Sequence, residues 1–188
     1  MSVCSRSLLL LAVSVHLLAD SRARENAYFV SPDGTTFGDG SAAKPWDLQT
    51  ALSLKLPPGA TLFLRGGSYA GPFVSRLSGT PERPLLVTAY AGERVLLEGA
   101  AGGAVLVASG SWTEFRDIEI AGGDIGILLT GTHLKLIGCS IRDNGSGVVI
   151  DPQAGSVELA GNFIYGNRGD GILVRGGTQP RLLAANAV

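Results

Sequence analysis

Short aliphatic segments recur in the second half of the chain at an almost constant interval, and this repeat limits the possible folds strongly. The segments of one set begin 22, 21 and 24 residues apart, and those of a second set begin 21, 23 and 24 residues apart. The first set is 105–107, 127–129, 148–150 and 172–174, and the second is 115–120, 136–141, 159–164 and 183–188. Two independent sets that share one period indicate a chain of repeated structural units.

The length and composition of the repeat predict short β-strands. A unit of about 22 residues is too short for the paired helices of common helical repeats. Most segments are β-branched-rich and are bounded by Gly, Asn or Asp, which is typical of strands joined by tight turns. We therefore predict an all-β parallel solenoid, in which each coil adds about 4.8 Å of height and equivalent residues stack on one another.

The repeat predicts four columns of buried residues, because no coil can bury its apolar face without its neighbours. The columns are Ile120, Ile141, Ile164 and Val188; Phe115, Leu136, Leu159 and Leu183; Val105, Ile127, Val148 and Ile172; and Val107, Leu129, Ile150 and Val174. Strand side chains alternate between two faces. The residues between the inward positions, Leu106, Leu128, Val149 and Leu173, are therefore expected to form an apolar stripe on the outer face.

Four polar or reactive residues of the repeats receive structural interpretations. Asn162 and Asn186 share one turn position, so we expect them to point inward and to bond neighbouring coils. Cys139 occupies the same position one coil earlier, which favours a small buried residue over a nucleophile. His133 begins a coil without a Ser or Cys partner placed by the pattern, which favours an exposed turn residue over a catalytic base.

Composition excludes two broad classes of protein. The chain has 188 residues, a net charge of −1 and no basic excess of the kind that nucleic-acid-binding proteins show. Hydrophobic residues make up 45 % of the sequence, which excludes a disordered chain, and the 27 glycines indicate frequent turns.

Residues 1–23 have the pattern of a secretory signal peptide, with one early Arg, a short apolar run and small residues before the expected cleavage site after Ala23. The alternative is a buried N-terminal helix. Cleavage leaves Cys139 as the single cysteine, so no internal disulfide can form. We therefore predict a secreted, extracellular or periplasmic protein that is not anchored in a membrane after cleavage.

Residues 24–103 are expected to form an N-terminal cap and the first coils, and residues 104–188 the regular repeats. An amphipathic helix is predicted over 45–54, with Pro45 in its first turn and Leu48, Ala51 and Leu52 on one face. A helix here would cover the apolar core that the first coil exposes. Val188 falls midway through a coil, so we expect the solenoid to be truncated at its C-terminal end, as the N-terminal piece of a longer protein, unless a partner caps it.

Several motifs resemble one known family. They are YFVSPDG, GDGS and KPW, then LPPGATLFLRGGSY, PLLVTAYAGERVLLEG and the repeat unit NFIYGNRGDGILV. Together they resemble secreted right-handed parallel β-helix proteins of the pectin-lyase-like superfamily, near family 9 pectate lyases. The resemblance covers nearly all of the chain after residue 23. It implies a right-handed parallel β-helix, but one fold hosts many functions.

The resemblance implies that the protein acts on or binds a polysaccharide. In lyases of this kind, Ca²⁺ binds the uronate carboxylate, a Lys or Arg removes the neighbouring proton, and the glycosidic bond is eliminated. The expected function is the N-terminal portion of such a lyase, or of a glycosidase that uses paired carboxylates, with this chain inactive by itself and Ca²⁺ as the cofactor of a full-length lyase. A non-catalytic glycan-binding or surface scaffold module is the alternative. The sequence leaves open the sugar, the bond and the oligomeric state.

Asp151 and Arg175 are the candidate substrate-binding residues. They share an outward register on neighbouring coils, with Thr130 one coil earlier, so they would lie about 4.8 Å apart at the rim of a sugar-binding groove. An exposed ion pair between them is the favoured interpretation.

No catalytic residue and no metal ligand is assigned from the sequence. Carboxylates are not clustered as a calcium site requires. Asp143 and Asp170 are expected to form turns, and Asp33 and Asp39 to shape the Gly-rich front loop. Lys135 is expected to have no acidic cluster in register with it.

Overall fold

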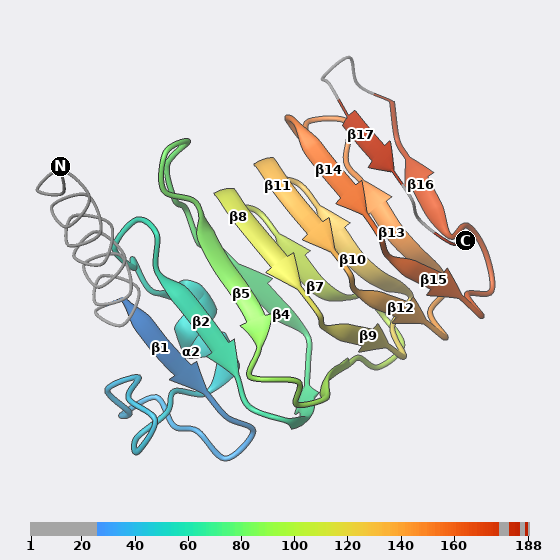
Figure 1. The fold of residues 1–188 in the computed structure, drawn as a ribbon. Helices are drawn as coiled ribbons and strands as arrows, with labels where there is room; N and C mark the ends of the chain where they lie inside the picture. The colour runs from blue at the N-terminus through green and yellow to red at the C-terminus, as the bar shows by residue number, and fades with distance from the viewer. Residues whose placement is uncertain (1–25, 177–180, 185–186, 188) are drawn as a thin grey trace, which may run out of the picture.

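The computed structural model describes residues 26–176, 181–184 and 187, which form three parallel sheets and one short helix (Figure 1). Sheet 1 contains β1 (Ala27–Val30), β2 (Thr61–Leu64), β5 (Leu85–Ala89), β8 (Ser111–Arg116), β11 (Thr132–Ile137), β14 (Val157–Ala160) and β17 (Arg181–Ala184). Sheet 2 contains β3 (Gly67–Ala70), β6 (Val95–Glu98), β9 (Glu119–Ala121), β12 (Ser140–Arg142) and β15 (Phe163–Tyr165). Sheet 3 contains β4 (Phe73–Ser75), β7 (Ala104–Ala108), β10 (Ile125–Leu129), β13 (Ser146–Ile150) and β16 (Ile172–Val174).

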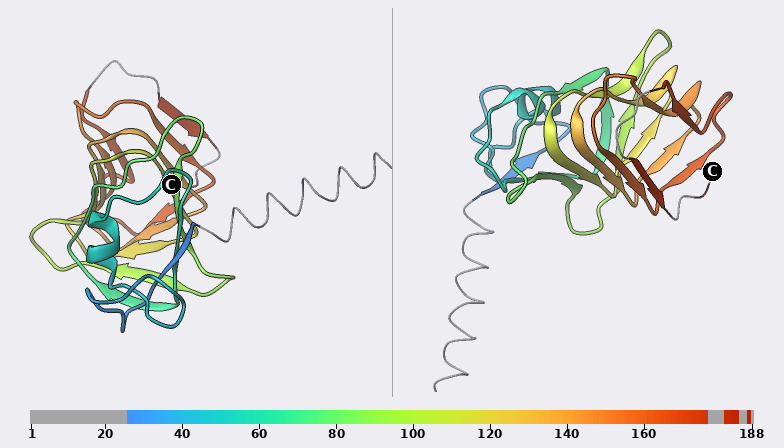
Figure 2. Two further views of the ribbon diagram at one scale, coloured as in Figure 1. Left: turned by 90° about the vertical axis from the view of Figure 1, so that its left-hand side faces the viewer. Right: turned by 90° about the horizontal axis from the view of Figure 1, so that it is seen from above.

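From β2 onward the chain visits sheets 1, 2 and 3 in turn, and each strand pairs in parallel with the equivalent strand of the next coil. The views in Figure 2 show these coils stacked along one axis. The predicted all-β parallel solenoid is therefore confirmed.

The corners between sheets need residues with left-handed backbone conformation. At the corner between sheets 1 and 2, this position is taken by Asp117, Gly138 and Gly161 on successive coils, with φ of 54°, 65° and 63°. Asp143 takes the equivalent position between sheets 2 and 3, with φ of 56°. Gly, Asp and Asn adopt this conformation most readily, so Asp143 is a turn former as predicted.

Two of the predicted interior columns are confirmed by backbone register and burial. Leu97, Ile120, Ile141 and Ile164 align across sheet 2, and each is at most 1 % exposed. In sheet 1, Val87, Phe115, Leu136 and Leu159 align in the same way and are equally buried, and Leu183 continues their backbone register. Val188 lies outside the described residues. Full burial of each aliphatic side chain stabilises the fold by about 1.5–3 kcal/mol.

The predicted columns of sheet 3 were wrong by one residue in their first coil. Leu106, not Val105, pairs with Ile127, and Ala108, not Val107, pairs with Leu129. Val105 lies one position earlier, opposite Gly126, and is also fully buried. Val105 is the second residue of β7, at the position that Gly126 holds in β10, and this apolar residue made the aliphatic run of β7 appear to begin one position too early. The later pairs, Ile127 with Val148 and Val148 with Ile172, are as predicted. The predicted burial of Val174 was wrong, since this residue is 39 % exposed.

Helix α2 (Leu48–Ser53) closes the N-terminal end of the stack (Figure 2). The helix buries Leu48, Ala51 and Leu52 against the first coils, as predicted. It begins later than expected, because Asp47 is the N-cap and its side chain accepts a hydrogen bond from the Thr50 N–H. The prediction that Pro45 lies in the first helical turn was therefore wrong.

Inward asparagines tie the coils together at two corners. The Asn162 side chain accepts a hydrogen bond from the Cys139 N–H and donates one to the Leu136 carbonyl, both at 2.9 Å, which confirms its predicted inward position. Asn186 lies outside the described residues. A second inward pair, Asn144 and Asn167, lies between sheets 2 and 3 and was not predicted, although the two residues are one repeat apart.

No helix in the described part of the chain is both long and apolar enough to cross a membrane. The predicted signal peptide, residues 1–23, lies outside that part.

Candidate functional site

The outer face of sheet 3 carries an aliphatic row. Val107, Leu128, Val149 and Leu173 align on successive coils, so the predicted outward stripe exists, with Val107 in the place expected for Leu106. Leu106 instead points inward and is 1 % exposed. Val149 has no exposed surface, and Leu128 and Leu173 are half-buried. The accessible part of this row therefore consists of Val107, Leu128 and Leu173, and it contains no titratable group.

Asp151 and Arg175 follow directly after β13 and β16, at the edge of this floor. Their N–H groups donate to the Leu129 and Ile150 carbonyls, at 3.0 and 2.9 Å, so the two residues occupy equivalent positions on neighbouring coils, as predicted. Thr130 holds the same position one coil earlier. The predicted register of the three candidates is present in the structure.

The ion pair favoured for Asp151 and Arg175 is not among the ion pairs of the described residues, so this prediction was wrong. The Asp151 carboxylate instead accepts a hydrogen bond from the Gln153 N–H at 2.9 Å and shapes the following turn. Arg175 is exposed and, within the described part of the chain, its guanidinium has no carboxylate partner. Its role in substrate binding stays a prediction.

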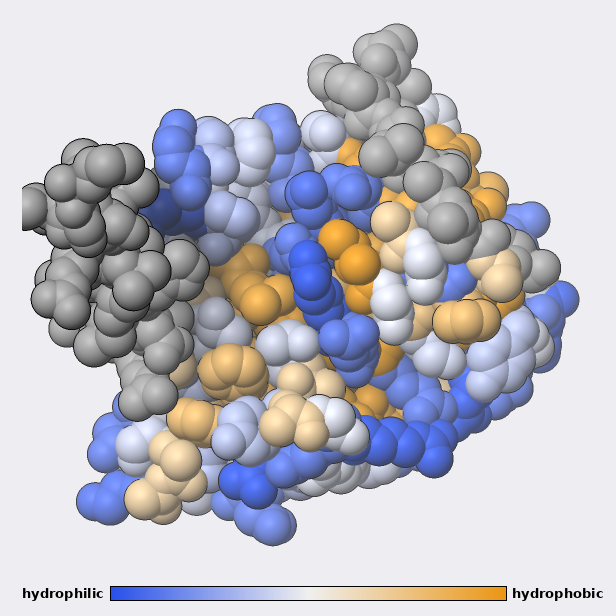
Figure 3. Space-filling view, viewed as in Figure 1, coloured by the Kyte–Doolittle hydropathy of each residue, from blue (hydrophilic) through white to orange (hydrophobic). Residues whose placement is uncertain are grey.

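The outer face of sheet 1 carries charges that the sequence reading missed. Lys135 lies between Glu114 and Glu158 in register, and its ammonium group is 2.7 Å from the Glu158 carboxylate. The expectation that no acidic cluster is in register with Lys135 overlooked these two glutamates, which the strand spacing of 21 to 23 residues would have revealed. Figure 3 shows hydrophilic residues between hydrophobic ones on this face.

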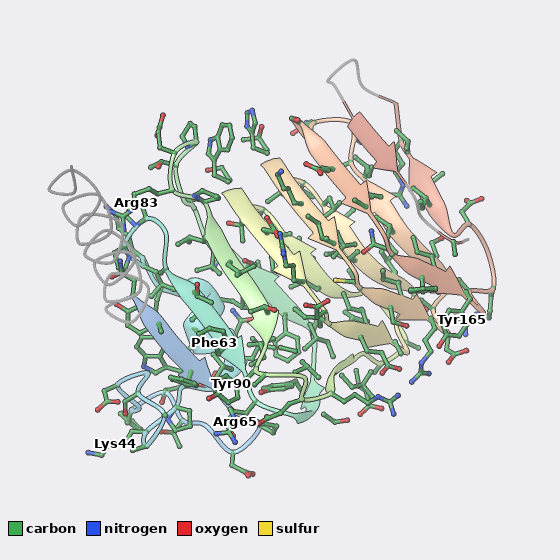
Figure 4. All side chains as sticks on the ribbon, viewed as in Figure 1. Lys44, Phe63, Arg65, Arg83, Tyr90 and Tyr165 are labelled. Carbon is green, nitrogen blue, oxygen red and sulfur yellow. The ribbon has the colours of Figure 1, made fainter. Side chains whose placement is uncertain are left out.

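An aromatic cluster covers the N-terminal part of the same face. The ring centroids of Phe29, Phe63 and Tyr90 are 5.5–5.7 Å apart. The Arg65 guanidinium lies 5.3 Å from the Tyr90 ring centre and pairs with Glu93 at 3.1 Å. Phe63, Arg65 and Tyr90 lie close together in Figure 4. Because Arg65 is already paired and the rings cover one another, this cluster serves to stabilise the first coils.

His133 is half-buried rather than exposed, which corrects its expected environment. Its ring stacks on Trp112 of the preceding coil, with 3.7 Å between centroids and 11° between planes. Its Nδ1 lies 3.0 Å from the Thr132 hydroxyl. Both rings extend from backbone in the left-handed region, with φ of 50° and 53°. These contacts give His133 a packing role at the start of β11.

Cys139 is fully buried and free, in agreement with its predicted structural role. Burial raises the pKa of its thiol to about 12. The thiolate, which is the nucleophilic form, is therefore not populated at neutral pH.

The carboxylates of the described residues do not fit a calcium site. Ca²⁺ takes six to eight oxygen ligands, which several converging carboxylates usually supply. No group of three or more His, Cys, Asp or Glu residues suited to a metal ion occurs among residues 26–176 and 181–184. In the front loop, hydrogen bonds from the Ser41 side chain and then from the Ser41 N–H lower the pKa of the Asp39 carboxyl group, and the N–H bond shapes the loop. We therefore derive no chemical step through calcium.

Residues 92–185 match the family described as right handed beta helix region. The chain belongs to this family. The right-handed β-helix predicted from the resemblance is thus confirmed, and the likeness extends to enzymes of the pectate lyase type.

Three sequence relatives of this right-handed β-helix are lyases by name. Pectate lyase PEL9 of Emericella nidulans is 29 % identical over 118 residues, which cover 53 % of this chain and 28 % of that enzyme. Pectate lyase L of Thermoclostridium stercorarium is 28 % identical over 140 residues, which cover 70 % of this chain and 11 % of that enzyme. Pectate disaccharide-lyase of Dickeya chrysanthemi is 33 % identical over 119 residues, which cover 63 % of this chain and 14 % of that enzyme. The chain therefore spans less than a third of the length of these relatives.

Solved structures show the same fold. The crystal structure of pectate lyase Pel9A aligns with a TM-score of 0.66 at 20 % identity, covering 77 % of this β-helix and 40 % of that chain. The alginate lyase of Paenibacillus sp. str. FPU-7 aligns with a TM-score of 0.58 at 27 % identity, and the alignment covers 63 % of this β-helix and 41 % of that chain.

Proposed function

We propose that this β-helix is a secreted protein that binds an acidic polysaccharide of the pectate type. The observation that carries the proposal is its sequence likeness to pectate lyases from three different organisms. Two forms of the proposal remain open: a part of a β-eliminase whose catalytic groups lie outside this chain, and a non-catalytic glycan-binding module. The names of the relatives favour the first.

The edge of sheet 3 supplies a binding surface for such a polymer. The half-buried aliphatic residues Val107, Leu128 and Leu173 form its floor, and Arg175 stands at its rim as an exposed cation. A guanidinium can hold a uronate carboxylate by two parallel hydrogen bonds. Asp151 is one coil away and carries a negative charge, so Arg175 is the residue we assign to the substrate carboxylate.

Elimination needs further groups that the described residues do not bring together. A lyase must neutralise the uronate carboxylate and place a base with a lowered pKa beside the acidic proton. The sheet 3 edge offers one unpaired arginine and no group of converging carboxylates among the described residues. We therefore propose that the 188-residue chain binds the polymer without cleaving it.

Affinity electrophoresis in gels containing polygalacturonate tests the binding. We expect the polymer to retard the chain and Arg175→Ala to reduce the retardation by several-fold. Arg168→Ala is the matched control, because it removes the same charge from the same coil at a different corner, where Arg168 is 72 % exposed and lies 3.9 Å from Asp124. Equal mobility of the wild-type protein with and without polymer would refute the proposal.

An absorbance assay for unsaturated uronate products, with and without a chelator, tests the catalytic part of the proposal. We expect no product from this chain under either condition. Chelator-sensitive product formation would show that the chain itself is a complete lyase.

A further inference from the structure

Two aromatic side chains stand on the outer face of sheet 2. Phe163 and Tyr165 of β15 are 61 % and 53 % exposed, and they are two residues apart on one strand. Alternate residues of a strand point to the same face, so the two rings lie side by side, roughly 7 Å apart along the strand. Tyr165 lies at the end of β15 in Figure 4. Exposed aromatic residues that adjoin one another on a soluble protein are typical of interaction sites.

The described register partners of Phe163 have small side chains. In register, Phe163 lies between Ser140 and Ala187, both of which have small side chains. Phe163, Ile164, Tyr165 and Ala187 line a hollow of about 260 Å³ along β15. A second hollow, of about 240 Å³, lies at the start of β9 and β12 in the same sheet, and its lining includes the polar residues Glu119 and Ser140. The surface therefore combines flat apolar rings with polar groups at their edge.

The two arginines of this surface are already paired with carboxylates. Arg142, the register partner of Tyr165, forms ion pairs with Glu119 and Asp143. Arg94 donates two hydrogen bonds to the Glu119 carboxylate, at 2.7 and 3.0 Å. Neither guanidinium is left to balance a carboxylate of a ligand, in contrast to Arg175 at the edge of sheet 3. The chemistry of the surface thus fits an uncharged ligand.

We propose that the outer face of β15 is a second glycan-binding site, which takes a neutral polysaccharide. The Phe163 and Tyr165 rings pack against the C–H faces of successive pyranose rings, and Ser140, Arg142 and Asp143 hydrogen-bond to their hydroxyl groups. The site lies on sheet 2 and is separate from the acidic-polymer surface of sheet 3. It would hold the protein on a composite material in which charged and neutral polysaccharides occur together.

Affinity electrophoresis of the full chain in gels with xylan or galactan tests this site. We expect retardation by at least one of these polymers, with little change as salt is raised, because no net charge is involved. Phe163→Ala combined with Tyr165→Ala should weaken binding about tenfold, which corresponds to about 1.4 kcal/mol. Tyr165→Phe should keep most of the affinity, because it keeps the ring.

Phe37→Ala is the matched control, since Phe37 is 95 % exposed and lies in the front loop, far along the sequence from β15. The β15 rings are exposed, so we expect their removal to leave the unfolding temperature unchanged. Equal binding of the double variant and the Phe37→Ala variant would overturn the proposal, as would the absence of retardation of the wild-type chain by either neutral polymer.

Two further measurements separate this site from other roles of the same surface. The double variant should still bind polygalacturonate, and Arg175→Ala should still bind the neutral polymer, so each site can fail without the other. Sedimentation velocity measures self-association. The proposal is wrong if two results occur together: the wild-type chain is a dimer while the double variant is a monomer, and the double variant binds neutral glycan with the same affinity as the wild type. In that case β15 is a contact between copies of the chain.

Discussion

Asn144 has no exposed surface and uses its side-chain amide to satisfy backbone groups of two coils. Its carbonyl oxygen accepts a hydrogen bond from the Gly123 N–H, and its amide nitrogen donates to the Arg142 carbonyl at 2.8 Å. The Asn144 N–H in turn donates to the Asn167 side chain. At such a corner the backbone has left the sheet, so only a side chain can complete its hydrogen bonds.

We therefore expect Asn144→Ala to lower the free energy of unfolding by roughly 2–4 kcal/mol, because it leaves buried backbone groups without partners. Asn167→Ala should have a smaller effect, since Asn167 is half-buried and water can replace part of its bonding. Urea unfolding followed by far-UV circular dichroism measures both variants. Equal losses would show that burial does not determine the contribution of these asparagines.

Helix α2 covers the open edge of sheet 3 as well as the apolar core of the first coils. The Gln49 side chain accepts a hydrogen bond from the Val74 N–H at 2.9 Å and donates one to the Val74 carbonyl at 3.1 Å. The Leu52 carbonyl accepts a third, from the Arg76 N–H. The amide of one side chain thus imitates a neighbouring strand, which protects an edge that could otherwise pair with another chain.

Gln49→Ala should lower the free energy of unfolding by about 1–3 kcal/mol through the loss of both bonds to Val74. Gln49→Glu keeps an acceptor for the Val74 N–H but loses the donor, so its effect should be intermediate. Urea titration gives the order of the three proteins, and light scattering at high concentration reports aggregation through β4. A Gln49→Ala protein as stable as the wild type would show that α2 covers the core only.

Across the whole molecule, each coil is stabilised by its neighbours, and some charged residues contribute to that stacking. Glu119, which is 11 % exposed, accepts hydrogen bonds from Arg94 of the preceding coil and Arg142 of the following coil. The hydrogen bond from Arg94 is the main cause that lowers the pKa of Glu119 below its ordinary value of 4.5. The charged form of this carboxyl group is therefore favoured by folding.

A carboxyl group whose pKa falls on folding stabilises the protein above its unfolded-state pKa, and this stabilisation is lost as the pH falls through the lowered folded-state value. The unfolding temperature of Glu119→Gln should thus be below that of the wild type at neutral pH, and the difference should shrink as the pH drops below 4.5. Differential scanning calorimetry across this range measures it. A difference that stays constant in acid would mean that the ion pairs do not contribute through charge.

The candidate site was predicted from the sequence less completely than the fold. Asp151 and Arg175 were placed in the correct register, because strand alternation and the repeat determine which residues stack. The favoured ion pair between them was a wrong prediction. A side chain can bond any neighbouring group, and the Asp151 carboxylate bonds the Gln153 N–H, two residues away in the chain. Phe163 and Tyr165 lie inside a recognised repeat, but nothing in their spacing shows that the neighbouring residues leave them uncovered.

The sequence by itself determined the coil architecture, the interior columns and the covering helix, because all three follow from local periodicity and from the need of each apolar face for a neighbour. Only the tertiary structure decided the one-residue register at Val105, the second asparagine pair and the ion pairs around Glu119. These features depend on which atoms meet at corners and between coils, and distances of a few ångströms there are set by the packing of the whole stack.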